Sequence, residues 1–447
     1  MEKWPIVNST FSLTQECNLR CAYCFTHGKS NKKMSLDTGK RCVDFLIHNA
    51  KDAELEQLPY KKRLIDICFW GGEPLLEWEL LKQITLYAET VSRENAIFVN
   101  FGGTTNGTLL TPDKIPFLKD HNVSFMISLD GGQKTHNWYR KTVTGKGSHT
   151  TIMKNMVHIL KAWPNCRVRM SPFPERIDNF YNDAKYLFEH GVTNFMFSPV
   201  YENNWTKDTW DIWEKESYKV VDLVADYRKK GIRIEIEHFK SYQCGTVSDW
   251  PCGAGRFYVG FDADGAIYPC HRFIKFNDDR DWREKETCFG HVDCGITRPE
   301  FRKLFIDFFN PESCKDCESF TGTPCHGGCY ALNYDLMGDV RKHPDKECEY
   351  VSMQKKVSEY YKDKIGREDS KLHGCVCRNM CYLENTPEEI KNIDDSGRQC
   401  ICDFHANYTG SLDPSVARPL ELKTITPQEV MDLLRKLEAR VKNLEEK

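Results

Sequence analysis

The sequence lacks the features that would direct the chain to a membrane or out of the cell. Its first ten residues, MEKWPIVNST, contain neither the basic nor the apolar region of a signal peptide, and its apolar runs are far shorter than a bilayer span. A net charge of −3 over 447 residues provides no excess of positive charge for nucleic acid or an anionic membrane surface. These absences predict a cytoplasmic protein that binds neither nucleic acid nor membrane.

Cysteine, in contrast, is abundant, with 21 in the chain. The cytoplasm keeps thiols reduced, so we expect metal binding rather than disulfides. Most of the cysteines fall in three groups, at residues 17–24, 244–348 and 375–402.

The first group has three thiols and lacks a fourth ligand. Cys17, Cys21 and Cys24 form the pattern C-x3-C-x2-C within ECNLRCAYCF, residues 16–25. A structural zinc site or a fully ligated [4Fe-4S] cluster needs four protein ligands, and the nearest candidate, His27, would have to fold back from the loop exit. A cluster held by three thiolates has one open iron for a substrate or a cofactor. The alternatives are a zinc knuckle or a chance cluster of cysteines.

The first two hundred residues alternate between strand-like and helix-like stretches. We predict strands at 6–13, 63–70, 96–104, 123–129, 166–171 and 194–200. We predict helices at 35–50, 76–93, 111–120, 148–162 and 177–189. This alternation predicts an α/β fold with a parallel sheet and right-handed crossovers, as in a partial (β/α)6 TIM-like barrel. Functional groups are then expected where the strands end.

Candidate ligand-binding turns follow the first four strands. They are the cysteine loop, Gly71-Gly72-Glu73-Pro74, Thr104-Thr105-Asn106-Gly107 and Ser128-Leu129-Asp130-Gly131. Each of the last three is an ordinary turn when taken singly. At the same edge of one barrel as an open cluster site, they indicate a binding site.

CNLRCAYC, FWGGEPLL, TTNGTLL and SLDG together resemble the radical S-adenosylmethionine (SAM) superfamily. The resemblance covers about two hundred residues. It implies that Cys17, Cys21 and Cys24 bind a [4Fe-4S] cluster and that SAM chelates the fourth iron. It also implies one-electron cleavage of SAM to methionine and a 5′-deoxyadenosyl radical, which abstracts hydrogen from substrate. The implied SAM contacts are Gly71, Gly72, Glu73 and Pro74, at the methionyl amino group, and Tyr23, Asn106, Ser128 and Arg140. For Arg140 the alternative is a solvated charge at a helix end.

The second group contains five cysteines in thirty-five residues, 314–348, and includes a C-x2-C pair. This is a strong metal signal, for which a zinc ribbon is the alternative. With the hairpin predicted at 256–268, the region resembles the SPASM domain, which carries two auxiliary clusters. The resemblance implies a first auxiliary cluster on Cys252, Cys270 and Cys329, with Cys244 as a candidate fourth ligand. Without Cys244, an open iron is available to a substrate thiolate. The second auxiliary cluster is implied on Cys314, Cys317, Cys325 and Cys348.

The third group lies in a tail that matches neither motif. We favour a further metal site on its cysteines over redox-active or substrate-handling thiols; they are Cys375, Cys377, Cys381, Cys400 and Cys402. The chain then ends in an amphipathic helical pattern. The predicted domains are a radical SAM partial barrel (1–205), a helical linker (206–240), an auxiliary-cluster domain (241–350) and a C-terminal extension (351–447). We also predict a helix near 349–365, where the extension begins.

The resemblance implies a maturase of ribosomally made peptides, which installs a cross-link such as a thioether or carbon–carbon bond in a precursor peptide, one that we expect to contain cysteine. It implies a one-electron donor such as flavodoxin or ferredoxin. With only sixteen residues before Cys17, we expect leader recognition by the tail or by a separate leader-binding protein. The first alternative is sulfatase-type formylglycine formation. Enzymes of that class carry an acidic residue directly after the cysteine that matches Cys270. In this chain His271 stands there instead, and it is a candidate base. The second is a non-catalytic iron–sulfur or zinc scaffold.

Overall fold

A computed structural model describes residues 4–26, 28–58, 62–240, 252–306, 314 and 328–365. His27, the terminal amphipathic helix and several predicted metal ligands lie outside the described residues. These ligands are Cys244, Cys317, Cys325, Cys375, Cys377, Cys381, Cys400 and Cys402.

The strands are β1 (Asn8–Thr14), β2 (Leu19–Cys21), β3 (Leu64–Gly71), β4 (Phe98–Thr105), β5 (Val123–Ser128), β6 (Arg140–Thr142), β7 (Arg167–Met170), β8 (Asn194–Phe197), β9 (Glu235–Ile236), β10 (Tyr258–Phe261), β11 (Ala266–Tyr268), β12 (Gly290–His291) and β13 (Gly295–Ile296). Eleven of them form one sheet in the order β13-β12-β11-β10-β1-β3-β4-β5-β7-β8-β9. The pairings from β10 to β9 are parallel, whereas β10, β11, β12 and β13 pair antiparallel. The separate pair β2–β6 is antiparallel.

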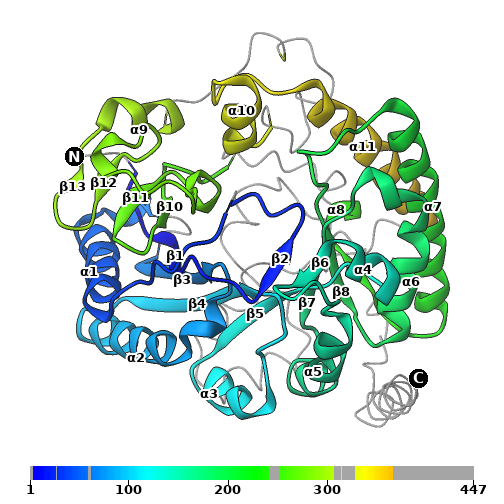
Figure 1. Ribbon diagram of the computed structural model, residues 1–447, viewed down its shortest axis with the longest axis horizontal. Coiled ribbons are helices and arrows are strands. Elements are labelled where there is room, and N and C mark those ends of the chain that lie inside the picture. The colour runs from blue at the N-terminus through cyan, green and yellow to red at the C-terminus, as the bar shows by residue number, and fades with distance from the viewer. Residues whose placement is uncertain are drawn as a thin grey trace, which may run out of the picture.

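The helices are α1 (Leu36–Asp52), α2 (Trp78–Glu94), α3 (Ile115–Asp120), α4 (Gln133–Tyr139), α5 (His149–Ala162), α6 (Phe180–Glu189), α7 (Lys207–Lys229), α8 (Glu237–Lys240), α9 (Pro299–Ile306), α10 (Tyr330–Met337) and α11 (Asp345–Ile365). Helix α1 begins where the Ser35 side chain accepts a hydrogen bond from Thr38 N, as an N-cap does. Figure 1 shows α1, α2, α3, α5, α6 and α7 around the outside of the curved sheet, with β2 within the curve. The predicted parallel α/β barrel is confirmed.

The barrel strands are built from alternating side chains. In β3, Ile65, Ile67 and Phe69 are buried in the hydrophobic core that packs against the helices. Asp66, Cys68 and Trp70 alternate with them and therefore face the opposite side, the inside of the curve. Polar residues on that inner face are available for ligands.

The elements found by sequence periodicity agree with the structure within a few residues. The helix predicted at 177–189 begins with a 3-10 turn, Pro174–Asn179, and becomes α-helical at Phe180. The hairpin predicted around 262–265 is confirmed, but its first strand also pairs in parallel with β1, so the sheet continues beyond the barrel. Short strands β2, β6, β9, β12 and β13 were not predicted.

Helix α11 contains the predicted metal ligand Cys348 in its first turn and packs along α7 (Figure 1). Its Tyr350 meets a stack of tryptophans, with ring centroids 5.4 Å from Trp213 and 6.0 Å from Trp210. Trp205 stacks on Trp210 at 4.2 Å. Large buried aromatic contacts of this kind fix the start of α11 on the barrel.

None of the helices within the described ranges is long and apolar enough to cross a membrane.

Candidate functional site

The three N-terminal cysteines lie on the loop that leaves β1 and runs through β2. Cys21 is opposite Arg140 in the β2–β6 pair, and Ala22 N donates to Tyr139 O at 3.1 Å. Cys24 N donates to Cys21 O, also at 3.1 Å. Backbone pairing with β6 therefore sets the position of Cys21 and Cys24 on the loop.

Positive charge surrounds two of the thiols. Burial raises the pKa of Cys21, and the nearby Arg140 guanidinium offsets part of that rise. Burial also raises the pKa of Cys24, but the Lys29 ammonium 3.1 Å from its sulfur and the hydrogen bonds from Thr26 together hold that pKa below its usual value. Burial raises the pKa of Cys17 to about 12. Cysteine binds metal as the thiolate, so these cations favour the ligating form and offset the charge of an anionic cluster.

The Gly71–Pro74 turn is pressed against the entry to the cysteine loop. Gly72 N donates to Thr14 O at 2.7 Å, and Glu73 N donates to Glu16 O at 3.0 Å. A Cβ at Gly72 would stand 2.0 Å from Glu16 O, and one at Gly71, where φ is +141°, would stand 2.2 Å from Thr14 O. Both glycines are thus required by the close approach of the two backbones.

Gly72→Ala is expected to destabilise the fold by about 1–3 kcal/mol, because the added methyl group overpacks the contact with the cysteine loop. Urea unfolding measures this change. Gly102→Ala is the matched control: its added Cβ would have Ser124 O as its nearest neighbour, at 3.8 Å, an ordinary contact. Equal unfolding free energies for the two variants would contradict the assigned role of Gly72.

Glu73 is fully enclosed at this turn, with 1% of its surface exposed. Its carboxylate accepts from Asn106 N at 2.8 Å, from Thr105 Oγ1 at 2.7 Å and from Leu75 N at 3.2 Å. Burial raises its pKa to about 7. The side chain therefore joins the turn after β3 to the turn after β4.

Asn106 and Ser128 lie at the same edge of the sheet. The Asn106 amide donates to Asn18 Oδ1 at 2.8 Å and approaches Cys17 Sγ at 3.9 Å. Ser128 is the last residue of β5 and is 8% exposed. Asn106 thus contacts the cysteine loop directly, while Ser128 lies one strand further along the sheet.

Tyr23 and Arg140 meet at the carboxylate of Asp130. Arg140 Nε lies 2.6 Å from Asp130 Oδ2, which also accepts from Tyr23 OH at 2.6 Å, and the guanidinium stands over the Tyr23 ring. Burial raises the pKa of Asp130, but the Arg140 charge and the hydrogen bonds from Arg140 and Tyr23, together with His136, outweigh it and leave that pKa below the usual value. Arg140 is 6% exposed, so the alternative of a solvated helix-end charge is wrong.

Three cysteines of the middle group lie near enough to one another for their charges to interact. Burial raises the pKa of Cys270, and the neighbouring Cys252 and Cys329 thiols, when charged, raise it further. Cys329 N donates to Glu347 Oε1 at 3.0 Å, which connects this group to the start of α11. The first auxiliary set implied by sequence is brought together, apart from Cys244, which is outside the described residues.

His271 follows Cys270 and joins the two cysteine sites through an aromatic cluster. Trp70 of β3 stacks on Phe25, next to Cys24, at 6.0 Å, and lies 5.3 Å from the His271 ring. His271 Nδ1 and Tyr258 OH are 2.7 Å apart. Burial, together with Arg272 and Arg169, lowers the pKa of His271 to about 3, so the ring is neutral and weakly basic.

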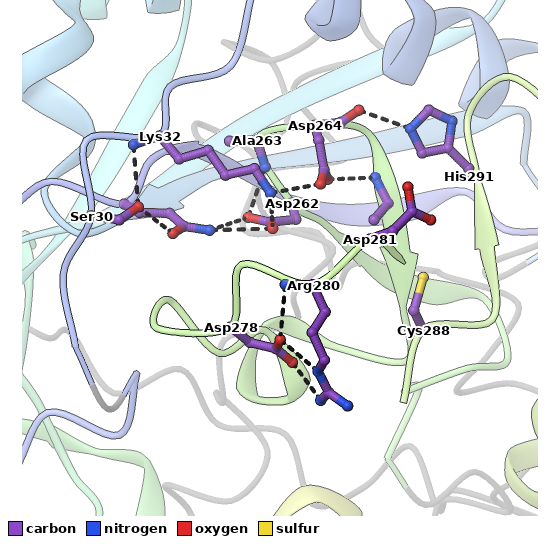
Figure 2. A network of polar contacts seen from close by, with 12 residues as sticks. Ser30, Lys32, Asp262, Ala263, Asp264, Asp278, Arg280, Asp281, Cys288 and His291 are labelled. Atoms are coloured by element: carbon purple, nitrogen blue, oxygen red, sulfur yellow. Dashed lines mark hydrogen bonds and ion pairs between the residues drawn. The ribbon is translucent and has the colours of Figure 1, made fainter. Parts of the chain in front are cut away.

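A polar network also fixes the cysteine loop against the β10–β11 turn (Figure 2). Lys32 Nζ lies 3.1 Å from Asp262 Oδ2 and 2.6 Å from Asp264 Oδ2. Gln15, ahead of the loop, donates to Asp262 at 2.9 Å and accepts from Ser30 Oγ at 2.7 Å. Both sides of the cysteine loop are thereby bound to the hairpin that leads to Cys270.

Comparison with known proteins identifies the barrel. Residues 11–198 match the profile of the radical SAM superfamily. Those residues are a radical SAM domain. The chain is 25% identical over 332 residues to a cysteine-type anaerobic sulfatase-maturating enzyme of Clostridium novyi, covering 71% of this chain and 85% of that protein. It is 24% identical over 356 residues to the mycofactocin maturase MftC of Mycolicibacterium smegmatis, covering 76% and 81%. The protein is a radical SAM enzyme.

Solved structures share the fold. The structure titled "Native anSMEcpe with bound AdoMet" aligns with a TM-score of 0.60 at 18% identity, covering 80% of this chain and 97% of that one. Streptococcus suis SuiB bound to precursor peptide SuiA aligns with a TM-score of 0.53 at 13% identity, covering 77% and 76%. These likenesses extend beyond the radical SAM domain of this chain.

The radical SAM domain implies a [4Fe-4S] cluster and SAM, and the cysteine loop fits the cluster in its chemistry. Three thiols on one loop, with Lys29 and Arg140 beside them, are a donor set for an iron–sulfur centre with one open iron. In the part of the chain that the structure describes, no three His, Cys, Asp or Glu side chains converge tightly enough for a single metal ion. A cluster is larger than one ion and does not require that convergence.

Proposed function

We propose that the chain matures a peptide or protein and installs a thioether or carbon–carbon cross-link in a cysteine-containing precursor peptide. One observation carries the proposal: similarity to maturases covers about three quarters of the chain, 76% for MftC, and reaches past the radical SAM domain into the cysteine-rich region. Sulfatase-type formylglycine formation is the second candidate, favoured by the 25% identity to the Clostridium novyi enzyme.

Cys17, Cys21 and Cys24 would hold the SAM cluster, and Cys252, Cys270 and Cys329 would hold an auxiliary cluster. When bound, the first cluster and SAM supply a deoxyadenosyl radical, and the auxiliary cluster accepts the second electron of the oxidation. The chain's own part is positional. Lys32, Asp262 and Gln15 hold the two cysteine sites in fixed relation, and the Trp70 and His271 rings lie 5.3 Å apart between them. A substrate bound against these rings would be oriented for hydrogen abstraction and shielded from water.

The residue after Cys270 sets this chain apart from the sulfatase class. Thioether formation and aldehyde formation from cysteine both release a proton after hydrogen abstraction. His271 occupies the position of the acid in the sulfatase class, and its pKa of about 3 makes it a weak base at neutral pH. Its Nδ1 is also engaged with Tyr258 OH.

The products distinguish the two reactions. The reconstituted, reduced protein is incubated anaerobically with SAM and either a synthetic cysteine-containing peptide or a sulfatase peptide. The products are then analysed by mass spectrometry. Cross-linking removes two hydrogen atoms and retains sulfur, whereas formylglycine formation exchanges sulfur for oxygen. Deoxyadenosine with an unchanged sulfur count supports the proposal, and loss of sulfur would establish the second candidate. If the wild-type protein forms no deoxyadenosine at all, both reactions are refuted, and the alternative of a non-catalytic iron–sulfur or zinc scaffold is supported.

His271→Ala tests whether the imidazole acts as the base. Loss of a general base slows a reaction by roughly 10²–10⁴-fold. We expect the variant to retain product formation with a much smaller loss, because the wild-type imidazole is a poor base. The rate of product formation, measured with saturating peptide, is the readout. A loss of the full size, roughly 10²–10⁴-fold, would instead assign the general-base role to His271.

The remaining features complete the proposal. We place the enzyme in the cytoplasm, with flavodoxin or ferredoxin as its one-electron donor. Cys314, Cys317, Cys325 and Cys348 would hold a second auxiliary cluster within residues 241–350. The cysteines of the extension, 351–447, would hold a further metal.

A further inference from the structure

Acidic residues are missing from the two parts of the chain that form the small β2–β6 sheet. The sequence contains 65 Asp and Glu residues, yet none lies within 17–36 or within 131–174. The first range includes the cysteine loop and β2, and the second includes α4, β6 and α5. In the part of the chain that the structure describes, no carboxylate forms an ion pair with Arg20, Lys141 or Lys146. The sheet therefore carries positive charge that no acid offsets.

The β2–β6 pairing places two of these cations side by side. Arg20 is the cross-strand partner of Lys141, and both side chains are exposed. Like charges at directly opposed positions of an antiparallel pair destabilise it. Arg20 Nη1 donates to Leu19 O at 2.9 Å, a contact that orients the guanidinium without cancelling its charge. The fold gains nothing from this pair, whereas a negatively charged partner would be attracted to it.

Exposed apolar side chains flank the cations along the chain. Trp138, in the last turn of α4, is 57% exposed, and Val143, just after β6, is 59% exposed. The Arg176 guanidinium stands 4.6 Å from the centre of the Trp138 ring, while the Glu175 carboxylate accepts from Tyr139 OH. Tryptophan and arginine are enriched in protein interfaces. We call the following residues the basic face: Arg20, Trp138, Lys141, Val143 and Lys146.

The basic face lies across the β2–β6 strands from the inner side of the cysteine loop. Side chains alternate along a strand, so Arg20 points to solvent, whereas Leu19 and Cys21 point the other way, and Leu19 is buried. Cys21 pairs with Arg140 in the same two strands. A protein bound to the basic face is thus separated from Cys21 by one layer of backbone. Electron transfer slows steeply with distance, so this position suits a redox partner.

We propose that the basic face is the docking surface for an acidic one-electron donor protein of the flavodoxin type. One electron leaves the reduced flavin of the donor and enters the cluster held by the cysteine loop. The inference rests on the SAM cluster and the donor of the proposed function, and it adds the place where they meet. Electron-transfer complexes bury little surface, and opposite charges speed their formation in a salt-dependent way. An acidic precursor peptide is the other occupant that this charge would suit.

The test compares the double variant Lys141→Glu/Lys146→Glu with the control Lys119→Glu/Lys161→Glu. The control reverses two exposed lysines on the outer helices α3 and α5, so the two variants have the same net charge. Both are full-length, reconstituted proteins. Deoxyadenosine formation from SAM is measured with reduced flavodoxin and, separately, with dithionite, a small reductant that needs no docking surface. Each assay is repeated over a range of sodium chloride concentrations.

We expect the basic-face variant to lose roughly 10-fold or more of the flavodoxin-driven rate at low salt and to keep the dithionite-driven rate. The flavodoxin-driven rates of the wild type and the control should fall with salt, whereas that of the basic-face variant should change little. Equal flavodoxin-driven rates in the two variants overturn the proposal. So does a wild type that dithionite drives and flavodoxin does not.

Other outcomes name what the lysines do instead. An equal loss with both reductants assigns them to the fold and overturns the proposal. A basic-face variant that keeps its flavodoxin-driven rate but loses affinity for an acidic, cysteine-containing synthetic peptide assigns the face to the peptide. If the wild type forms no deoxyadenosine with either reductant, the SAM cluster of the proposed function is itself refuted, and the docking surface fails with it.

Discussion

Replacing Cys17, Cys21 and Cys24 together with alanine is expected to remove about one third of the iron and all deoxyadenosine formation. One SAM cluster with two auxiliary clusters contains about twelve irons, and loss of the first leaves about eight. The three thiols share one loop, so the triple variant leaves the cysteines of the other groups in place. Anaerobic reconstitution, an iron assay and chromatography of the reduced reaction with SAM provide the measurements.

Cys166→Ala is the matched control for that variant. Cys166 is buried and lies outside the three cysteine groups, so its removal is expected to leave iron and deoxyadenosine unchanged. About sixteen irons in the wild type would assign a further cluster to the C-terminal extension. Zinc in place of iron in the wild type would refute the assignment of the loop to a SAM cluster.

Asp130→Asn is expected to destabilise the protein by about 3–5 kcal/mol, because Arg140 would remain buried without its counter-ion. Asparagine preserves the size of the side chain, so the loss is electrostatic. Asp130 also accepts from Ser171 N at 2.9 Å and from Tyr23 OH, and it joins the cysteine loop to β6 and to the end of β7. Chemical unfolding at neutral pH measures the stability, and SAM cleavage reports the position of Tyr23.

The pH dependence of this pair has a definite sign. The pKa of Asp130 is lowered in the folded state, so its contribution is complete above the unfolded aspartate value, about 4. It is lost as the pH falls through the folded value. The difference in unfolding free energy between the wild type and Asp130→Asn should therefore become smaller at acidic pH. Asp226→Asn, which breaks an exposed pair with Lys229, is the control and should change stability by no more than about 0.5 kcal/mol. Equal losses in the two variants would contradict a buried, stabilising pair.

Much of the barrel could be predicted because its signals are local. The strand Leu64–Gly71 alternates core and inner-face side chains, and Ser35 caps the helix that it precedes. The cysteine spacing is contained in eight residues. Each of these depends on neighbours in the sequence, so one sequence is enough to find them.

The contacts around the cysteines depended on pairings that no local pattern contains. Asp130 was noted only as part of a turn, although it forms a buried ion pair with Arg140 through the short β2–β6 sheet. Lys32 and Asp262 are 230 residues apart, and Cys314 Sγ lies 3.1 Å from His343 Nε2 although the two residues share no motif. Predicting such pairs requires the register of the strands and loops that bring them together, and short strands carry too little pattern to reveal it.

The parallel pairing of β1 with β10 has a consequence for how the enzyme is made. Asn8 pairs with Tyr258, 250 residues later in the chain, so one edge of the first strand stays open until more than half of the protein has been synthesised. An unpaired edge strand is a template for association with other chains. A fragment that ends before β10 would keep that edge exposed for good and is expected to aggregate. The radical SAM barrel is therefore not expected to be stable as a separate domain without the strand that the cysteine-rich region contributes.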